Sequence, residues 1–149
     1  MKELSVTRFI AAAPDKVWDI MVNRQEEWWC PRPWTAELVA QDRFAGGRSA
    51  MIMRGPDGEE MPQEGIMLAW DEGRRFASTD AIIGDLEPAS PFMIGIWEIA
   101  PESEGTRYTA RARHWSDEAR QQHADMGFIA GWEACAEQLA QLCETGDVA

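Results

Sequence analysis

The C-terminal third of the chain contains one long stretch that has no proline and keeps a helical period. Ser116 precedes it, and its hydroxyl can accept a hydrogen bond from a free amide of the first turn. Asp117 and Glu118 then place negative charge at the positive end of the helix dipole, and Gly146 is a typical stop. One unbroken helix between these signals would run roughly 40 Å, enough to cross a small domain. We expect this helix to organise the fold.

One face of the expected helix changes character along its length. At about 100° per residue, that face carries Gln121, Asp125, Phe128, Trp132, Cys135, Leu139 and Leu142. The C-terminal half is ordinary core, but Gln121 and Asp125 would be costly to bury in a dry interior. Either these two belong to a solvated helix start, or they border a partly wet pocket. A helix with such a face, closing over a curved sheet, is expected to leave a cavity.

The residues before Ser116 alternate in short segments separated by turns. The expected strands are 4–12, 36–43, 48–54, 60–70, 75–81, 92–100 and 107–115, with short helical segments at 16–22 and 25–31. Short turns join antiparallel neighbours. The order predicts an α+β fold in which a seven-stranded antiparallel curved sheet surrounds one long C-terminal helix, with two short helices after the first strand.

Length and charge exclude several classes of protein. A chain of 149 residues predicts a single domain, 1–149. Its net charge of −12 disfavours nucleic acid, which needs clustered Lys and Arg, and anionic membrane surfaces. No apolar run approaches the ~20 residues of a membrane span, and the N-terminal apolar stretch is too short for a signal peptide. We therefore expect a cytoplasmic protein with no nucleic-acid or membrane partner.

The cysteines and histidines give no sign of a metal or redox site. Cys135 and Cys143 would lie about 12 Å apart along one helix, too far for a disulfide, so reduced thiols are expected. His114 and His123 flank the junction between the last strand and the helix, and no cysteines have metal-ligand spacing. The chain also lacks a phosphate-binding loop and a serine nucleophile elbow. We expect no metal and no cofactor.

Several short motifs occur in an order that is typical of a known family. They are Ala-Pro-Asp-Lys-Val-Trp at 13–18, Trp-Trp-Cys-Pro at 28–31, Gly-Gly at 46–47, Gly-Pro-Asp-Gly-Glu at 55–59, Gly-Thr-Arg-Tyr-Thr at 105–109, His-Trp at 114–115, and His123 through Met-Gly-Phe at 126–128 to Gly-Trp at 131–132. With these motifs the chain resembles the START-like helix-grip proteins of the SRPBCC superfamily. More narrowly, it resembles the branch named for the activator of the heat-shock-protein-ninety ATPase, also described as polyketide cyclase-like.

The resemblance covers nearly the full length and carries expectations about function. It implies a sheet wrapped around the long helix, with the two short helices at the mouth of a cavity. It also implies binding of a hydrophobic small molecule, the most common activity in this superfamily. The superfamily has no shared catalytic residue set, so the resemblance assigns no catalytic residue here.

Tryptophans are the first candidates for ligand contact, because the chain has eight of them. Periodicity places Trp97 and Trp132 on inner faces, as core or as cavity wall. Trp28 and Trp29 are adjacent and point in different directions, so we expect at least one near the mouth. A flat indole suits a ring-bearing ligand, although it also fills ordinary cores. Trp18 is expected to pack under the first helix.

Methionines and polar groups complete the predicted site. Met51 and Met53 share one face of their strand, where unbranched thioethers either fill gaps in the sheet or line an irregular pocket. The predicted ligand-binding set is Trp28, Trp29, Met51, Met53, Trp97, His114, Gln121, Asp125, Phe128 and Trp132.

Three residues are candidates for acid/base chemistry, should the chain be an enzyme. Small residues on one face of the last strand place His114 inside the protein or at its rim, where imidazole can bond a ligand or move a proton. Glu64 alternates with apolar neighbours and could turn inward, and Asp125 lies on the inner helix face. His123 falls roughly opposite Phe128 and Trp132, so we expect it to be solvated or to stabilise the junction.

Three hypotheses about function follow. The first is a non-catalytic binder of a hydrophobic, aromatic small molecule between the sheet and the C-terminal helix. The second is a cyclase, hydrolase or dehydratase that uses general acid/base chemistry on a polyketide-like substrate. The third is a co-chaperone-like interaction module, whose sign would be a large exposed apolar patch. We prefer the first, because the inner faces are mostly apolar and no catalytic pair stands out. Both a monomer and a homodimer fit the sequence.

Overall fold

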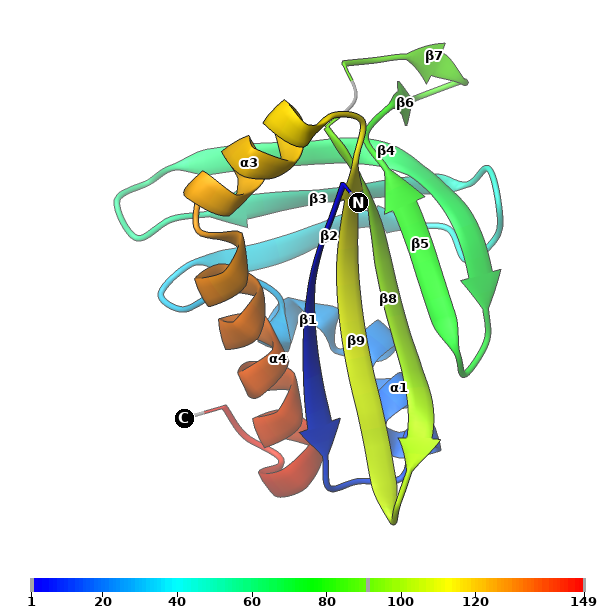
Figure 1. Cartoon of the computed structure of the whole chain (residues 1–149), viewed down its shortest axis with the longest axis vertical. Helices are drawn as coiled ribbons and strands as arrows, with labels where there is room; N and C mark the ends of the chain where they lie inside the picture. The colour runs from blue at the N-terminus through cyan, green and yellow to red at the C-terminus, as the bar shows by residue number, and fades with distance from the viewer. Residues whose placement is uncertain (1, 91, 149) are drawn as a thin grey trace.

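The structure, a computed structural model, describes residues 2–90 and 92–148. Its elements are β1 (Glu3–Ile10), α1 (Pro14–Asn23), α2 (Gln25–Trp28), β2 (Thr35–Gln41), β3 (Arg48–Arg54), β4 (Glu60–Asp71), β5 (Arg75–Thr79), β6 (Ile82–Ile83), β7 (Glu87–Pro88), β8 (Met93–Glu102), β9 (Gly105–His114), α3 (Asp117–Asp125) and α4 (Phe128–Thr145). Figure 1 shows α3 and α4 following one another along one side of β1.

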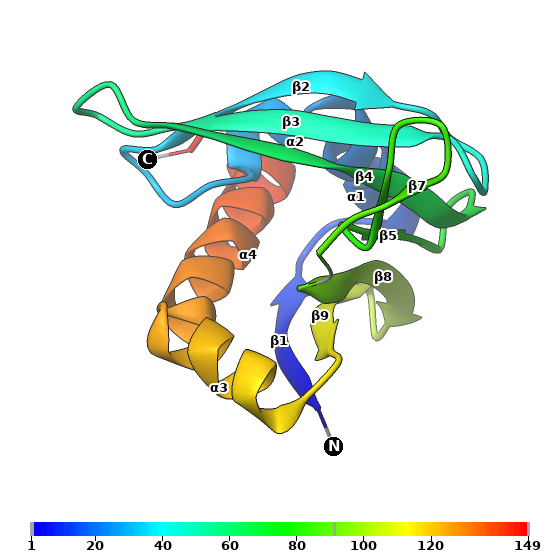
Figure 2. The ribbon, with the colours of Figure 1, turned by 90° about the horizontal axis from the view of Figure 1, so that it is seen from above.

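A bent seven-stranded sheet forms the body of the protein. Its order is β1-β9-β8-β5-β4-β3-β2, and every neighbouring pair is antiparallel. Figure 2 shows β2, β3 and β4 as one layer and β1, β8 and β9 turning away from it. Register irregularities at Leu38/Ala40 and Met67/Ala69 are bulges, which increase local bend and twist. The predicted α+β fold with its antiparallel sheet is confirmed, and β6 and β7 add a small hairpin.

The two short helices expected after the first strand are also confirmed. Pro14 opens α1, where a missing backbone N–H has no cost and the fixed φ suits a helix. The apolar positions Val17, Trp18 and Met21 are buried. In α2, the fully buried Trp28 donates its indole N–H to the carbonyl of Met21 at 3.1 Å, which ties the two helices together.

The C-terminal segment consists of two helices, so the expectation of one unbroken helix is wrong. Its start is as predicted, because Ser116 Oγ accepts a hydrogen bond from the Ala119 amide at 3.1 Å. The break falls at Gly127, whose φ of 92° lies in the left-handed region that glycine adopts without steric cost. The long C-terminal helix is therefore α4, which ends at Gly146 with φ 90°. Helical periodicity alone does not reveal such a break.

A fully buried part of the core lies around α4. Leu139 and Ala140 on α4 and Tyr108, Ala110 and Ala112 on β9 are fully buried. Small side chains on β9 leave room for bulkier neighbours in this layer. Within the described part of the chain, no helix combines the length and the apolar character that crossing a membrane requires.

Candidate functional site

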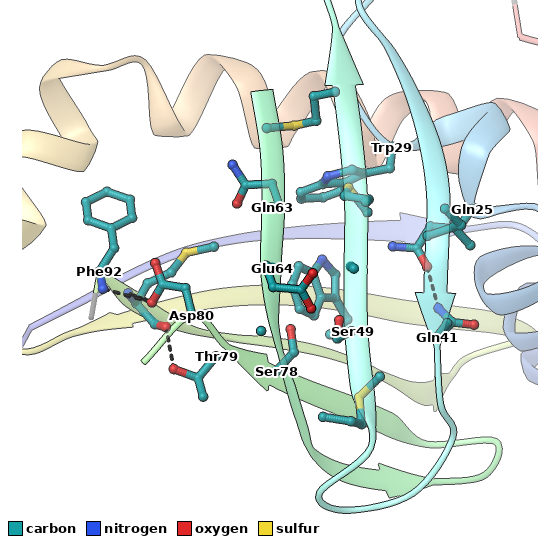
Figure 3. Close-up of a pocket in the computed structure, with 18 of the residues that line it drawn as sticks. Gln25, Trp29, Gln41, Ser49, Gln63, Glu64, Ser78, Thr79, Asp80 and Phe92 are labelled. Carbon is teal, nitrogen blue, oxygen red and sulfur yellow. Dashed lines mark hydrogen bonds between the residues drawn. The ribbon is translucent and has the colours of Figure 1, made fainter. Parts of the chain in front are cut away.

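A cavity of about 340 Å³ lies inside the bend of the sheet, with residues of α2, α3 and α4 completing its wall. Small-molecule pockets have volumes of about 300–1,000 Å³, so this one suits a compact ligand. Figure 3 looks into it across β2, β3 and β4. Alternate residues of a strand point to the same face. The inward face of each strand therefore decides the chemistry of the wall.

Three tryptophans from three different elements form one side of the cavity. The rings of Trp97 on β8 and Trp132 on α4 stack at 16° with centroids 5.7 Å apart. Trp29, at the end of α2, stands edge-on to both, at 5.6 and 5.1 Å. These are favourable geometries for aromatic pairs. Gly95 makes room for Trp97, because a Cβ there would lie 2.5 Å from its ring. The three rings form a rigid aromatic surface.

Methionines form another large part of the cavity wall. Met51 and Met53 come from β3, and Met61 and Met67 come from β4, all of them on the cavity wall. Met53 pairs directly with Met61 across the two strands. Because unbranched thioether chains adopt several rotamers at little cost, this wall can adjust to the shape of an apolar ligand.

Polar groups lie at two opposite ends of the cavity and also between them (Figure 3). At one end Gln41 Nε2 donates to Gln25 Oε1 at 2.6 Å. At the other end Asp80 Oδ1 accepts the backbone amides of Phe92 at 2.8 Å and Met93 at 3.2 Å. Among the described lining residues there is no lysine and no arginine, whereas two are carboxylates. The wall therefore offers no cation to an anionic ligand.

Some of the predicted site residues lie on this wall, and others do not. Trp29, Met51, Met53, Trp97, Trp132 and Glu64 line the cavity. Trp28 and Phe128 are buried outside its lining, and His114 is buried one residue layer behind it. Gln121 and Asp125 are exposed at the surface of α3 and also lie outside the lining. The structure thus places them at a solvated helix, the first of the two alternatives considered for them.

His123 differs most from its expected position. It is buried, it lines the cavity, and its Nδ1 lies 2.9 Å from His114 Nε2. Of the two roles expected for it, a solvated side chain is therefore wrong, whereas the bond to His114 across the strand-to-helix junction agrees with a junction-stabilising role. The physical reason is the break at Gly127, which changes the phase of α3 relative to α4. A single helical wheel across both helices therefore places His123 on the wrong face. The Met-Gly-Phe motif at 126–128 was the available signal, since glycine commonly ends helices.

The wall also includes residues outside the predicted set. Gln25, Gln63, Asp80, Phe92 and Met126 contribute to it. Gln63 could have been found, because it lies on the same strand face as Met61 and Met67. Phe92 and Asp80 come from the segment around the β6–β7 hairpin, which has no alternation that indicates a face.

The three acid/base candidates take part in three separate interactions. The Glu64 carboxylate pairs with Arg48 at 2.8 and 3.0 Å, and this hydrogen-bonded guanidinium lowers the pKa of Glu64. Asp125 accepts a hydrogen bond from Gln121 at 2.9 Å on the exposed side of α3. His114 bonds His123. A carboxylate held ionised by arginine is a poor general acid, and no hydrogen bond joins these three candidates among the described residues.

Within the part of the chain that the structure describes, neither the cysteines nor the possible metal ligands form a reactive site. All three cysteines are free and buried. Burial raises the pKa of Cys30 to about 11 and that of Cys135 to about 12, so both remain unreactive thiols at neutral pH. Across the described ranges, no three histidine, cysteine or acidic side chains gather as metal ligands would.

A bent antiparallel sheet, a long C-terminal helix and a cavity between them define the helix-grip class of proteins. The chain belongs to the family described as Activator of Hsp90 ATPase homolog 1-like protein, which residues 11–144 match. The family resemblance expected from the sequence motifs is thereby confirmed.

Solved structures from bacteria share this fold. Protein NE0264 from Nitrosomonas europaea is 32% identical, with a TM-score of 0.85 over 94% of this chain and 92% of that chain. Protein Ms6760 from Mycobacterium smegmatis is 30% identical, with a TM-score of 0.80 over 97% and 91% of the two chains. The AHSA1 (SPO3351) protein from Silicibacter pomeroyi, 18% identical with a TM-score of 0.67 over 93% and 94%, supports the fold alone. No curated protein matches the chain.

Proposed function

We propose that the protein binds a hydrophobic, aromatic small molecule in the cavity between the sheet and the C-terminal helices, without transforming it. The observation that carries this proposal is the composition of the cavity wall. The mutually packed rings of Trp29, Trp97 and Trp132, together with several adaptable methionines, line about 340 Å³ of space. An aromatic ring placed there would gain both stacking and burial of apolar area.

The two alternative functions have weaker support. A cyclase, hydrolase or dehydratase would need an acid/base pair within hydrogen-bond reach, and Glu64, Asp125 and His114 have separate partners. A protein-interaction module would need a continuous apolar patch. The most exposed large apolar side chains, Leu86, Met126 and Phe44, come instead from three different loops. Scattered apolar residues of this kind are normal on a surface.

Calorimetric titration with naphthalene, a compact neutral aromatic probe, tests the proposal. We expect saturable binding and a rise in melting temperature, because a ligand that binds only the folded state stabilises it. At a hundred times its dissociation constant the ligand adds roughly 2.7 kcal/mol of stability. Absence of both effects would contradict the proposal.

A matched pair of variants locates the binding site. Trp132→Leu removes part of the aromatic surface and should weaken naphthalene binding by about tenfold or more, since an aromatic pair and its buried area are lost together. Trp18 is also buried, but it lies outside the lining, donates to Glu72 Oε1 at 2.9 Å and packs edge-on against Trp70. Trp18→Leu should therefore reduce stability and leave the affinity within about twofold. Equal losses of affinity would place the binding site elsewhere.

A further inference from the structure

Two buried histidines form a hydrogen-bonded chain that ends at the cavity wall. His114 and His123 are only 6% and 8% exposed. His114 Nδ1 lies 2.9 Å from the carbonyl oxygen of Lys2, and His114 Nε2 lies 2.9 Å from His123 Nδ1. His123 in turn lines the cavity. The chain thus runs from the backbone of the N-terminal strand region to the ligand space.

The chemistry of this chain fixes where the protons are. A carbonyl oxygen only accepts, so His114 Nδ1 carries a proton and donates it to Lys2. In the neutral pair, His114 Nε2 is then an acceptor, and His123 Nδ1 must be the donor to it. This leaves His123 Nε2 without a proton. That nitrogen also has no hydrogen-bond partner among the described residues.

The ring of His123 is held in place by its neighbours. Phe92 and Phe128 pack on it with centroids 4.7 and 4.9 Å away, and Trp132 stands edge-on at 6.0 Å. Rotating the ring would break the bond to His114. The free Nε2 therefore lies on the side of the ring away from His114, in a fixed position on the wall.

A carboxylate lies at the end of the cavity where Phe92 packs on His123. Asp80 accepts the backbone amide of Phe92, whose ring packs on that of His123, so its carboxylate belongs to the Phe92 end of the cavity (Figure 3). The hydroxyl of neighbouring Thr79 is already used as a donor to the carbonyl of Met93 at 3.0 Å. No lysine or arginine is present among the described lining residues to attract a negative charge. A carboxylate or ether oxygen placed against Nε2 of His123 would face the lone pair of that nitrogen and could accept nothing from it.

We propose that the ligand is a neutral aromatic molecule with a hydroxyl group, and that this hydroxyl donates a hydrogen bond to Nε2 of His123. This rests on the proposed function of binding an aromatic molecule in the same cavity and adds to it the chemical class of the ligand. His123 is the specificity-determining residue. His114 is a positioning residue, because it acts on the ligand only by fixing the tautomer of His123. The tryptophan surface binds the ring system, and the histidine chain selects among rings.

Calorimetric titration with three probes tests the proposal: naphthalene, 2-naphthol and 2-methoxynaphthalene. The last two differ in whether their oxygen carries a hydrogen and can donate a hydrogen bond. We expect 2-naphthol to bind about tenfold more tightly than 2-methoxynaphthalene. This is the gain in affinity that one additional neutral hydrogen bond provides. In His123→Phe, which keeps a flat ring but no acceptor, this preference should vanish.

The outcomes separate the two proposals. If naphthalene binds and the two oxygen-bearing probes bind equally well to the wild-type protein, the hydroxyl proposal is overturned and the binding function stands. If none of the three binds, both fall. A preference for 2-naphthol that persists in His123→Phe would also overturn the assignment to His123.

Nitrogen-15 NMR of the wild-type protein provides a second measurement that does not depend on a variant folding. The free protein should show His123 with a protonated Nδ1 and an unprotonated Nε2. Adding 2-naphthol should shift the Nε2 resonance, and adding naphthalene should leave it nearly unchanged. A protonated Nε2 in the free neutral protein would overturn the proposal.

The role of His114 has a readout of its own. In His114→Leu the tautomer of His123 is no longer fixed, so NMR should show both tautomers and the preference for 2-naphthol should decrease. A purely structural role of His114 would leave the tautomer of His123 unchanged, which would contradict its assignment as a positioning residue.

Discussion

The two ends of the protein interior are built differently, although one helical segment runs along both. Around α4, Leu139, Ala140 and Tyr108 are fully buried in a closely packed layer. Around α3, the corresponding space is a cavity whose wall includes His123 of α3 and methionines of β3 and β4. Burial of apolar side chains is the dominant favourable contribution to the stability of a domain. The α4 end can therefore hold the fold together while the α3 end keeps space for a ligand.

The tryptophan cluster is the boundary between these two ends. Trp132 and Trp97 belong to the buried core and also line the cavity. Phe76 stacks on Trp97 with centroids 5.1 Å apart, which extends the cluster into the sheet. A rigid boundary of this kind lets the cavity be filled or empty without disturbing the packed layer.

The largest expected effect is on a residue of the packed end. Leu139→Ala should destabilise the protein by about 4 kcal/mol, because it removes fully buried methyl groups and leaves a void. Met51→Ala, on the half-buried cavity wall, should cost about 1 kcal/mol, since its side chain already borders empty space. Urea denaturation measures both. Equal losses of stability would show that the two ends are packed alike.

The next effect concerns pH and belongs to the cavity end. Burial, together with the neighbouring His114, lowers the pKa of His123 to about 4 from an ordinary value near 6.5. Between about pH 4 and pH 6.5, the imidazole of His123 is therefore protonated in the unfolded chain and neutral in the folded protein. The unfolded state binds more protons in this range, so the protein loses stability as the pH falls from about 6.5 to about 4. The full difference is about 3 kcal/mol.

Comparison with His123→Phe isolates this contribution from those of the carboxylates. The variant has no imidazole at that position, so its stability should fall less steeply over the same pH range. Denaturant titrations at several pH values provide the measurement. Parallel curves for the two proteins would mean that His123 titrates normally and is not buried as described.

A smaller effect distinguishes the two glycines of the C-terminal segment. Gly127 has a φ of 92°, so Gly127→Ala should cost about 1 kcal/mol from backbone strain alone. Gly131 lies within α4, and a Cβ there would meet Pro31 at an ordinary 3.7 Å. Gly131→Ala should therefore stabilise the protein by about 0.5 kcal/mol through reduced chain entropy. Melting temperatures would show the opposite signs, and a destabilised Gly131→Ala would contradict this account.

The sequence predicted the fold because its signals are local and agree with one another. Alternation within 48–54 and 60–70 matched β3 and β4 closely, and the hydroxyl of Ser116 marked the start of α3. The break at Gly127 could not be derived in the same way. It depends on one glycine adopting a positive φ, and the helical period on both sides is preserved.

The site was harder to predict because it depends on contacts between distant segments. Strand and helix periods were enough to place Trp97 and Trp132 on inner faces. The hydrogen bond between His114 and His123 depends on how α3 is oriented relative to β9. The break at Gly127 controls that orientation. The carboxylate of Glu64 was considered as an inward group, but its pairing with Arg48 on the neighbouring strand is set by strand register. No single-segment pattern contains that information.

The central claim is that an aromatic molecule occupies the cavity, and blocking the cavity tests it most directly. Ser78 is on the wall, opposite Met67 on the neighbouring strand, so Ser78→Phe should place a ring in the ligand space. Leu68→Phe adds a ring on the outer face of β4, where the side chain is exposed, and serves as the control. Calorimetric titration with naphthalene should show binding to the wild type and to Leu68→Phe but none to Ser78→Phe. Undiminished binding to a folded Ser78→Phe protein would contradict the account.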